Sequence, residues 1–130
     1  MTKSIKFIAS PDVAPPGGHY SAAVAWGDLV FISGQLPIRA DGSHAADLDF
    51  ETQARLALDN FLAVAAAAGA TREGVLKVTA YIVGIDNWPR FNGIYAERMS
   101  VHRPARVVAP VPELHYGCLI EIEGVAVRSA

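Results

Sequence analysis

Short apolar runs at both ends of the chain have the length and composition of β-strands. The predicted strands span residues 4–8, 22–26, 29–35, 75–83, 105–110 and 118–127. The second and third form a hairpin around Gly27-Asp28. The third is apolar on both faces until Ser33, as is typical of a central strand.

Two helices are predicted between these strands, because apolar residues there recur every three or four positions. The first begins near Asp49 and continues to Ala68. Either Asp47 or Asp49 can cap its start, and Gly69 can end it. The second begins at Asp86-Asn87-Trp88-Pro89, where proline is tolerated in the first turn. Its apolar stripe consists of Trp88, Phe91, Ile94, Tyr95 and Met99.

The predicted order is β-β-β-α-β-α-β-β within a single domain, residues 1–130. Each helix can serve as the crossover between two parallel strands. We therefore expect an α+β fold with one mixed sheet and both helices on one face. The other face, with Val30, Ile32, Val107 and Ala109 or their alternates, is too apolar to face water. A partner subunit is the expected cover.

Composition supports an oligomer and argues against other classes of protein. The hydrophobic fraction is 52% and the charged fraction 18%, so the chain has more apolar surface than one small core needs. No run approaches the length of a membrane span. The net charge of −2, without any Lys/Arg cluster, argues against a nucleic-acid partner. The absence of a secretory pattern at the start and the single cysteine favour the cytoplasm.

Two charged residues lie within the last two predicted strands, where burial without a partner is costly. Arg106 offers a guanidinium fork that matches a carboxylate, and Glu121 offers a carboxylate that can hold and activate a water. Together they suggest a site that binds a small organic acid and performs water chemistry beside it. A structural ion pair, or two solvated strand faces, is the alternative interpretation.

The remaining reactive side chains favour simpler explanations. The histidines at 19, 44, 102 and 115 have no metal-ligand spacing, so we expect no metal. His19 fits a surface loop better than a role as acid or base. Cys118 is expected to be packed and inert.

Several motifs resemble, in order, those of the Rid family (RidA/YjgF, also called L-PSP endoribonuclease-like). The resemblance covers nearly the whole chain. It is found in the hairpin 27–37, the helix 53–60, the strand 75–83, the segment 91–95, Pro104-Ala105-Arg106 and the strand 120–127.

The resemblance implies a chorismate-mutase-like homotrimer of the bacillus type, in which the sheets form a central barrel and the sites lie between subunits. It implies cofactor-free hydrolysis of enamine or imine acids, such as 2-aminoacrylate, to 2-keto acids and ammonia. Arg106 would hold the substrate carboxylate and Glu121 would position the attacking water. The implied lining consists of Tyr20, Ser33, Gly34, Asn92 and Val108.

Two departures from the family pattern concern the pocket wall. Val108 occupies the position of a cysteine in the archetype, and His19 precedes Tyr20 where the archetype has proline. We therefore expect a divergent paralogue with a changed choice of substrate. Two other functions remain open: a non-catalytic trimeric module that binds small carboxylates or acts as a chaperone-like scaffold, and an endoribonuclease, which the net charge disfavours.

Overall fold

The computed structural model describes residues 3–129 and contains one six-stranded sheet and two α-helices. The strands are β1 (Ile5–Ile8), β2 (Ala23–Trp26), β3 (Leu29–Gln35), β4 (Val75–Val83), β5 (Ala105–Val111) and β6 (Ile120–Val127). The helices are α1 (Phe50–Ala67) and α2 (Trp88–Met99), with short 3-10 turns η1 (Arg72–Gly74), η2 (Ile85–Asn87) and η3 (His115–Gly117).

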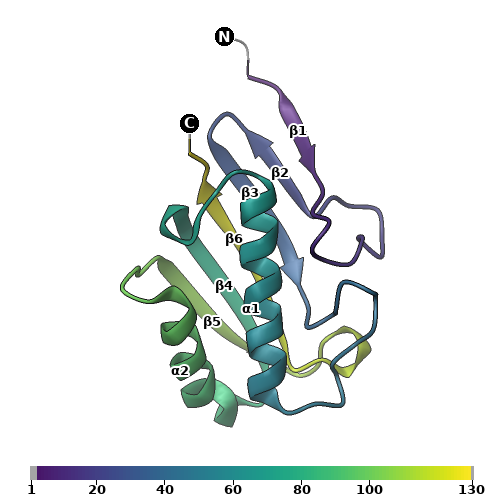
Figure 1. The fold of residues 1–130 in the computed structure, drawn as a ribbon. Coiled ribbons are helices and arrows are strands. Elements are labelled where there is room, and N and C mark those ends of the chain that lie inside the picture. Colours follow the sequence, from purple (N-terminus) through teal and green to yellow (C-terminus); the bar gives the residue numbers. More distant parts are fainter. Residues whose placement is uncertain (1–2, 130) are drawn as a thin grey trace.

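The sheet is mixed, and its strand order is β1-β2-β3-β6-β4-β5. The last strand, β6, lies between β3 and β4 and is antiparallel to both, while β4 and β5 are parallel. Both helices cover the same face of the sheet (Figure 1). The predicted element order and the two-helix α+β architecture are confirmed.

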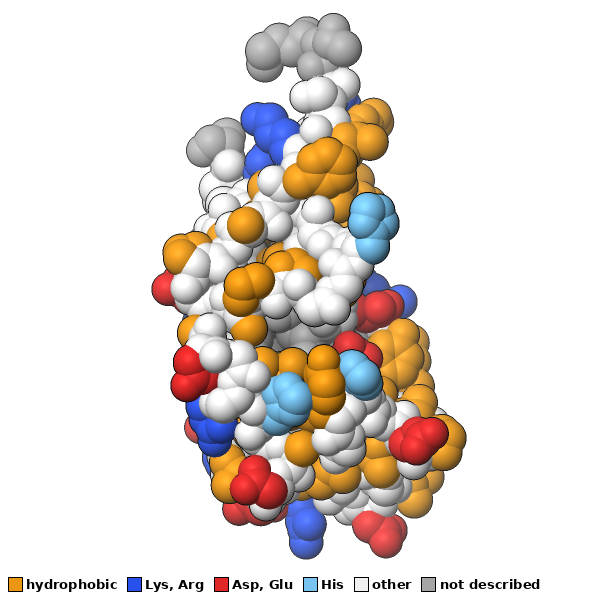
Figure 2. Space-filling model, turned by 90° about the vertical axis from the view of Figure 1, so that its right-hand side faces the viewer, with side chains coloured by type: hydrophobic (Ala, Val, Ile, Leu, Met, Phe, Trp, Pro, Cys, Tyr) orange, Lys and Arg blue, Asp and Glu red, His pale blue; other side chains and the backbone are white. Residues whose placement is uncertain are grey.

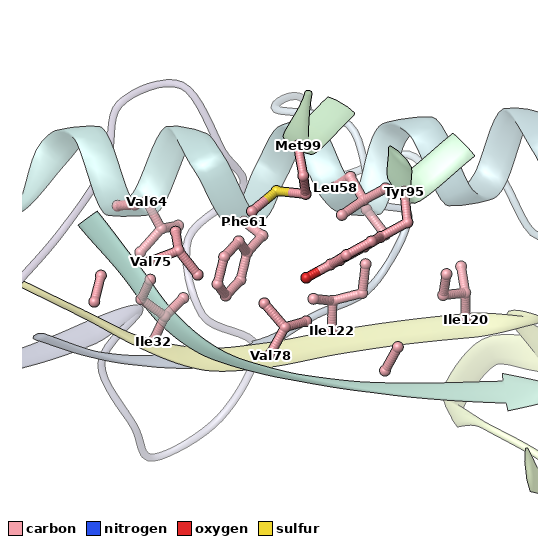
Figure 3. Close-up of a cluster of buried hydrophobic side chains, with 14 of the residues drawn as sticks. Ile32, Leu58, Phe61, Val64, Val75, Val78, Tyr95, Met99, Ile120 and Ile122 are labelled. Carbon is pink, nitrogen blue, oxygen red and sulfur yellow. The ribbon is translucent and has the colours of Figure 1, made fainter. Parts of the chain in front are cut away.

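Helix α1 forms where its sequence pattern predicts it. The Asp49 side chain caps the helix by accepting a hydrogen bond from the Thr52 amide at 2.8 Å. Gly69 follows the helix with a positive φ of 88°, a conformation that glycine adopts without a Cβ clash. The buried stripe of α1, including Leu58, Phe61 and Val64, packs on sheet residues such as Val78 and Ile122 (Figure 3).

One glycine in the sheet lets α1 approach closely. A Cβ added to Gly124 on β6 would collide with the Lys77 carbonyl oxygen and would lie 2.9 Å from the Phe61 ring. Helix α2 adds the predicted stripe Phe91, Ile94, Tyr95 and Met99 to the same core. The core is therefore a single layer between the helices and one face of the sheet.

The opposite face of the sheet has no cover within the chain and is markedly apolar. Pairing places Phe7, Val24, Phe31 and Val125 in one row across β1, β2, β3 and β6. Its exposed apolar side chains are Ile5, Phe7, Trp26, Phe31, Val107 and Val127. The expected apolar outer face thus exists, although Val30 and Ile32 point into the core and their alternate Phe31 faces outward. The trimer remains a prediction.

The ends of some elements differ slightly from expectation. β6 begins at Ile120 rather than at residue 118, so Cys118 lies in the loop after η3, where it is buried as expected. Burial raises the pKa of the Cys118 thiol, which keeps it in the unreactive protonated form. Neither helix within residues 3–129 is long and apolar enough to cross a membrane.

Candidate functional site at one end and one edge of the sheet

A cleft of about 340 Å³ opens at the end of β3 and β6, where three loops meet. The face of the molecule in Figure 2 is hollowed, and histidine and hydrophobic side chains gather around the hollow. The cleft is lined by the proline-rich segment 13–18, by Tyr20, Ala22, Gly34, Gln35, Leu36, Ile38, Gly42, His44, Asn60, His115 and Tyr116, and by Glu121.

Glu121 is the only Asp, Glu, Lys or Arg in this lining, and it lies against Gly34. A Cβ added to Gly34 would lie 2.7 Å from Glu121 Oε2, so only glycine leaves the carboxylate in its place. Partial burial and the neighbouring Glu123 raise the pKa of Glu121, while His115 acts in the opposite direction. A carboxylate with a raised pKa is a stronger base toward a bound water.

Arg106 belongs to a different surface, at the far edge of the sheet. It pairs with Val78 of the core face, and its guanidinium carbon lies 5.0 Å from the Tyr95 ring centre and 5.6 Å from that of Phe91. Aromatic faces attract a cation at this distance. The Arg106 side chain is exposed and forms no hydrogen bond or ion pair with any residue of the described chain.

Arg106 and Glu121 do not meet within one chain. Glu121 lies between Ile120 and Ile122, which both point into the core, so its side chain leaves the sheet on the other face. The two residues also lie on strands separated by β4. An ion pair between them within one chain is therefore excluded. Glu121 is half-buried on the uncovered face of the central strand β6, whereas Arg106 is exposed on the edge strand β5.

Of the other predicted lining residues, two lie at the cleft, two lie near Arg106 and one lies at neither surface. Tyr20 and Gly34 line the cleft with Glu121, and Tyr20 is 55% exposed. Asn92 is exposed on α2, and Val108 lies two residues from Arg106 on the same face of β5. Ser33 is not part of the cleft lining, and its hydroxyl donates to the Ser21 carbonyl at 2.6 Å.

Two buried polar residues of α1, Gln53 and Asn60, hold the cleft loops and were missed from the sequence. Gln53 donates to the Leu48 carbonyl at 2.9 Å and accepts from the Leu119 amide at 2.9 Å. Asn60 donates to the carbonyls of Leu36 and Ile38 at 3.1 and 2.8 Å. Both lie on the apolar stripe of the helix, and a polar residue on such a stripe indicates a buried hydrogen bond.

Three aromatic rings of the cleft were also missed as a group. His44 lies before α1, whereas His115 and Tyr116 lie between β5 and β6, and the sequence does not show that these loops meet. Within residues 3–129, no three His, Cys, Asp or Glu side chains are grouped to hold a metal ion.

Comparison with known proteins shows the family of the chain. Residues 11–128 match the family model described as Endoribonuclease L-PSP. A RutC family protein of Pyrococcus horikoshii is 36% identical over 121 residues, which are 93% of this chain and 96% of the relative. The "Putative reactive intermediate deaminase TdcF" of Escherichia coli K12 is 34% identical over 133 residues, and both chains are fully covered.

Solved structures agree with this result. The crystal structure of E. coli TdcF with bound serine matches with a TM-score of 0.89 and 32% identity, covering 95% of this chain and 99% of the other. The YjgF gene product of E. coli matches with a TM-score of 0.89 and 31% identity over the same shares. The chain is a two-helix α+β protein of this fold. It belongs to the endoribonuclease L-PSP family, the Rid family that its motifs resemble.

Proposed function

We propose that the protein is a cofactor-free hydrolase of small enamine and imine acids, and that it works in the cytoplasm as a homotrimer with sites between subunits. One observation supports this most directly: the Glu121 cleft has no Lys or Arg in its lining, whereas the Arg106 side chain has no ion-pair partner in the described chain. A second copy of the chain can supply an arginine to the cleft, and its own cleft can receive Arg106 of the first copy. The apolar outer face of the sheet gives the copies a surface to bury.

In the proposed site, Arg106 of one subunit holds the substrate carboxylate through a charge-assisted, bidentate contact. Tyr20, Gly34 and Glu121 of the neighbour enclose the reacting carbon, while Asn92 and Val108 line the wall beside Arg106. TdcF, a relative at 32–34% identity, has been crystallised with serine, which is itself a small amino acid with a carboxylate.

The chemistry requires few groups, because a protonated imine is already electrophilic. Glu121 takes a proton from a bound water while the water oxygen bonds to the imine carbon. The electron pair of the C=N bond passes to the nitrogen, which then takes the proton from Glu121. Glu121 removes the hydroxyl proton as the C–N bond breaks and passes it to the leaving ammonia, so ammonium and a 2-keto acid are the products. Fixing the carboxylate near the water supplies much of the rate by orientation alone.

Substituting the two residues separately tests this division of roles. Arg106→Ala should lose affinity for 2-keto acids by about 2–5 kcal/mol along with turnover, and Arg106→Lys should rescue it poorly. Glu121→Gln should keep keto-acid binding while imine hydrolysis falls by about 10²–10⁴-fold. Calorimetry with a keto acid and a coupled ammonia assay measure the two effects. Light scattering should give a trimeric mass for all the proteins.

Other outcomes would favour the two alternative functions. Normal imine hydrolysis by Glu121→Gln would make the carboxylate structural and favour a carboxylate-binding module. Cleavage of labelled single-stranded RNA that disappears in Arg106→Ala would favour the endoribonuclease for which the family is named. We expect no such cleavage, because the chain lacks a basic face.

A further inference from the structure

We propose that the cleft selects imino and keto acids with an aromatic side chain, and that the ring cluster of Tyr116, His44 and His115 forms the wall that selects them. This inference rests on the proposed function for the orientation of the ligand. It concerns the aromatic side of the cleft, to which neither the reaction nor the carboxylate contact assigns a role.

The three rings form a continuous stack. The Tyr116 ring centre lies 3.9 Å from that of His44 and 3.6 Å from that of His115, with interplanar angles of 37° and 33°. His44 comes from the loop before α1, whereas the other two belong to η3. The stack therefore joins two loops that lie far apart in the sequence, and all three rings line the cleft.

The backbone at Tyr116 has an unusual conformation that aims its ring. Tyr116 has a φ of 61°, in the left-handed region that a bulky residue rarely adopts. Such residues concentrate at ligand sites, where the surrounding structure maintains the strain. The Tyr116 hydroxyl reaches across the cleft, because a Cβ added to Gly17 in the proline-rich loop would lie only 3.9 Å from it.

Hydrogen bonds from two buried residues of α1 fix the same loops. Gln53 ties the segment that follows His44 to the segment that follows η3, through Leu48 and Leu119, and Asn60 holds Leu36 and Ile38. The aromatic wall is thus a pre-formed part of the cleft. A pre-formed apolar wall favours a rigid, planar ligand group, since little conformational entropy is lost on binding.

The size of the cleft fits a larger acid than 2-aminoacrylate. The cleft of one chain has a volume of about 340 Å³. Even if each heavy atom took the roughly 30 Å³ of a liquid water, which is an upper bound for bonded atoms, the six heavy atoms of 2-aminoacrylate would fill only about half of it.

Charge in the cleft also favours an aromatic group. Beyond Glu121 the lining contains no Asp, Glu, Lys or Arg, so a charged ligand side chain would find no partner there. Leu36, Ile38 and the rings offer apolar and aromatic contact instead. With the carboxylate at Arg106 of the partner subunit and the reacting carbon at Glu121, the side chain of the ligand extends toward Tyr116.

Binding of phenylpyruvate and pyruvate to the assembled wild-type protein, measured by calorimetry, tests the inference without any catalysis. We expect phenylpyruvate to bind at least about 10-fold more tightly. Tyr116→Asn should reduce this preference by about 3- to 10-fold, because asparagine tolerates a positive φ but has no ring. Tyr116→Phe should keep the preference, and His44→Ala, which lies outside the strained turn, should weaken it. Glu113→Gln, at an exposed residue that does not line the cleft, is the control.

The outcomes separate this inference from the proposed function. Equal affinity for the two keto acids, or a preference that survives in both Tyr116→Asn and His44→Ala, would overturn the aromatic wall even if imines are hydrolysed. A preference that depends on Tyr116 would support it even if no ammonia is released. Where hydrolysis occurs, the ratio of kcat/KM for the imines of phenylalanine and alanine should fall in Tyr116→Asn by the same factor as the ratio of affinities.

Discussion

The cleft at the end of β6 and the edge at β5 are two surfaces of the same sheet with opposite deficits. The cleft is a concave pocket with a carboxyl group of raised pKa and loops held by buried hydrogen bonds, but its lining has no Lys or Arg. The β5 edge has an exposed guanidinium over two aromatic rings, and Arg106 does not line the cleft. Each surface offers what the other lacks.

Under the proposed function, this difference is the reason why the chemistry needs more than one copy of the chain. An arginine over aromatic rings can bind an anion, yet an anion there would be open to water. A half-buried glutamate can hold a water, yet its cleft has no Lys or Arg to orient an acid. In the proposed assembly, bringing the two together would desolvate both and complete the site.

The largest expected effect comes from assembling the two halves from different chains. Arg106→Ala and Glu121→Gln should each be nearly inactive alone. Oligomers co-assembled from equal amounts of both should regain roughly a quarter of the wild-type activity, since one site in four would combine an intact arginine with an intact glutamate. The measurement is ammonia release by differently tagged, co-expressed variants.

The control for this experiment is Arg106→Ala co-assembled with the double variant Arg106→Ala/Glu121→Gln. No chain then carries the arginine, so no activity should return. If the two single variants also fail to complement each other, Arg106 and Glu121 do not form a shared site between chains, and the comparison of two half-sites would be wrong.

A smaller effect is expected from a methyl group placed inside the cleft. In Gly34→Ala the new Cβ would lie 2.7 Å from Glu121 Oε2 and would push the carboxylate aside. We expect hydrolysis to fall by about 10- to 10²-fold with little change in keto-acid affinity, because the water is misplaced while the arginine contact remains. Steady-state kinetics and calorimetry separate the two.

Gly17→Ala is the matched control on the same cleft. Its Cβ would lie 3.9 Å from the nearest atom, the Tyr116 hydroxyl, which is an ordinary van der Waals contact. Similar losses in both variants would mean that the cleft tolerates no added group anywhere. The close contact with Glu121 would then not be the cause.

Most of the fold could be predicted because its determinants are local. The three–four spacing of α1, the Asp49 cap and the end at Gly69 concern neighbouring residues, and the strands are separated by glycine or proline. The insertion of β6 between β3 and β4 could not be read from periodicity. Strand order depends on which long-range pairing buries the most surface.

The candidate site was predicted only in part, for the same reason. Residue types suggested Arg106 and Glu121, but their opposite faces follow from register, which is a property of the assembled sheet. The contact between His44 and Tyr116 depends on two loops that meet through Gln53. A polar residue on the apolar stripe of α1 was the available clue.

The Tyr95 ring beneath Arg106 allows a test of stability rather than activity. Tyr95 is 8% exposed, and its hydroxyl has no hydrogen-bond partner in the described chain. Figure 3 shows this hydroxyl pointing into the apolar cluster near Phe61. Tyr95→Phe should raise the free energy of unfolding by about 1 kcal/mol, since it removes an unpaired polar group and keeps the ring under the guanidinium.

Thermal or urea unfolding measures this change, and Tyr81→Phe is the control. The Tyr81 side chain is only partly buried and its hydroxyl lies near Glu123, so removing this hydroxyl should not stabilise the protein. Destabilisation by Tyr95→Phe would mean that the hydroxyl has a partner in the assembled protein. Keto-acid binding should be unchanged, because the aromatic face, and not the hydroxyl, lies beneath Arg106.

The smallest expected effect is a pH-dependent change in stability at Glu121. Desolvation first, and Glu123 second, raise the pKa of this carboxyl above its ordinary value of 4.5, so ionisation is less favourable in the folded protein. The stability it contributes is complete below that ordinary value and is lost as the pH rises through the raised pKa. Glu121→Gln, which cannot ionise, should therefore be slightly more stable than wild type at pH 7 and equal to it near pH 4.

Unfolding of both proteins at the two pH values measures this difference, with the exposed Glu113→Gln as a control that should show none. The sign of the result also tests the comparison of the two surfaces. If Glu121→Gln is instead less stable at neutral pH, Glu121 is paired with a cation in the assembled protein. The cleft lining contains no Lys or Arg but includes His115, so the same comparison in a His115→Gln background separates an imidazole of the same chain from a cation of a second chain. If the effect persists in that background, the carboxylate is occupied by Arg106 of the partner subunit rather than free to hold water.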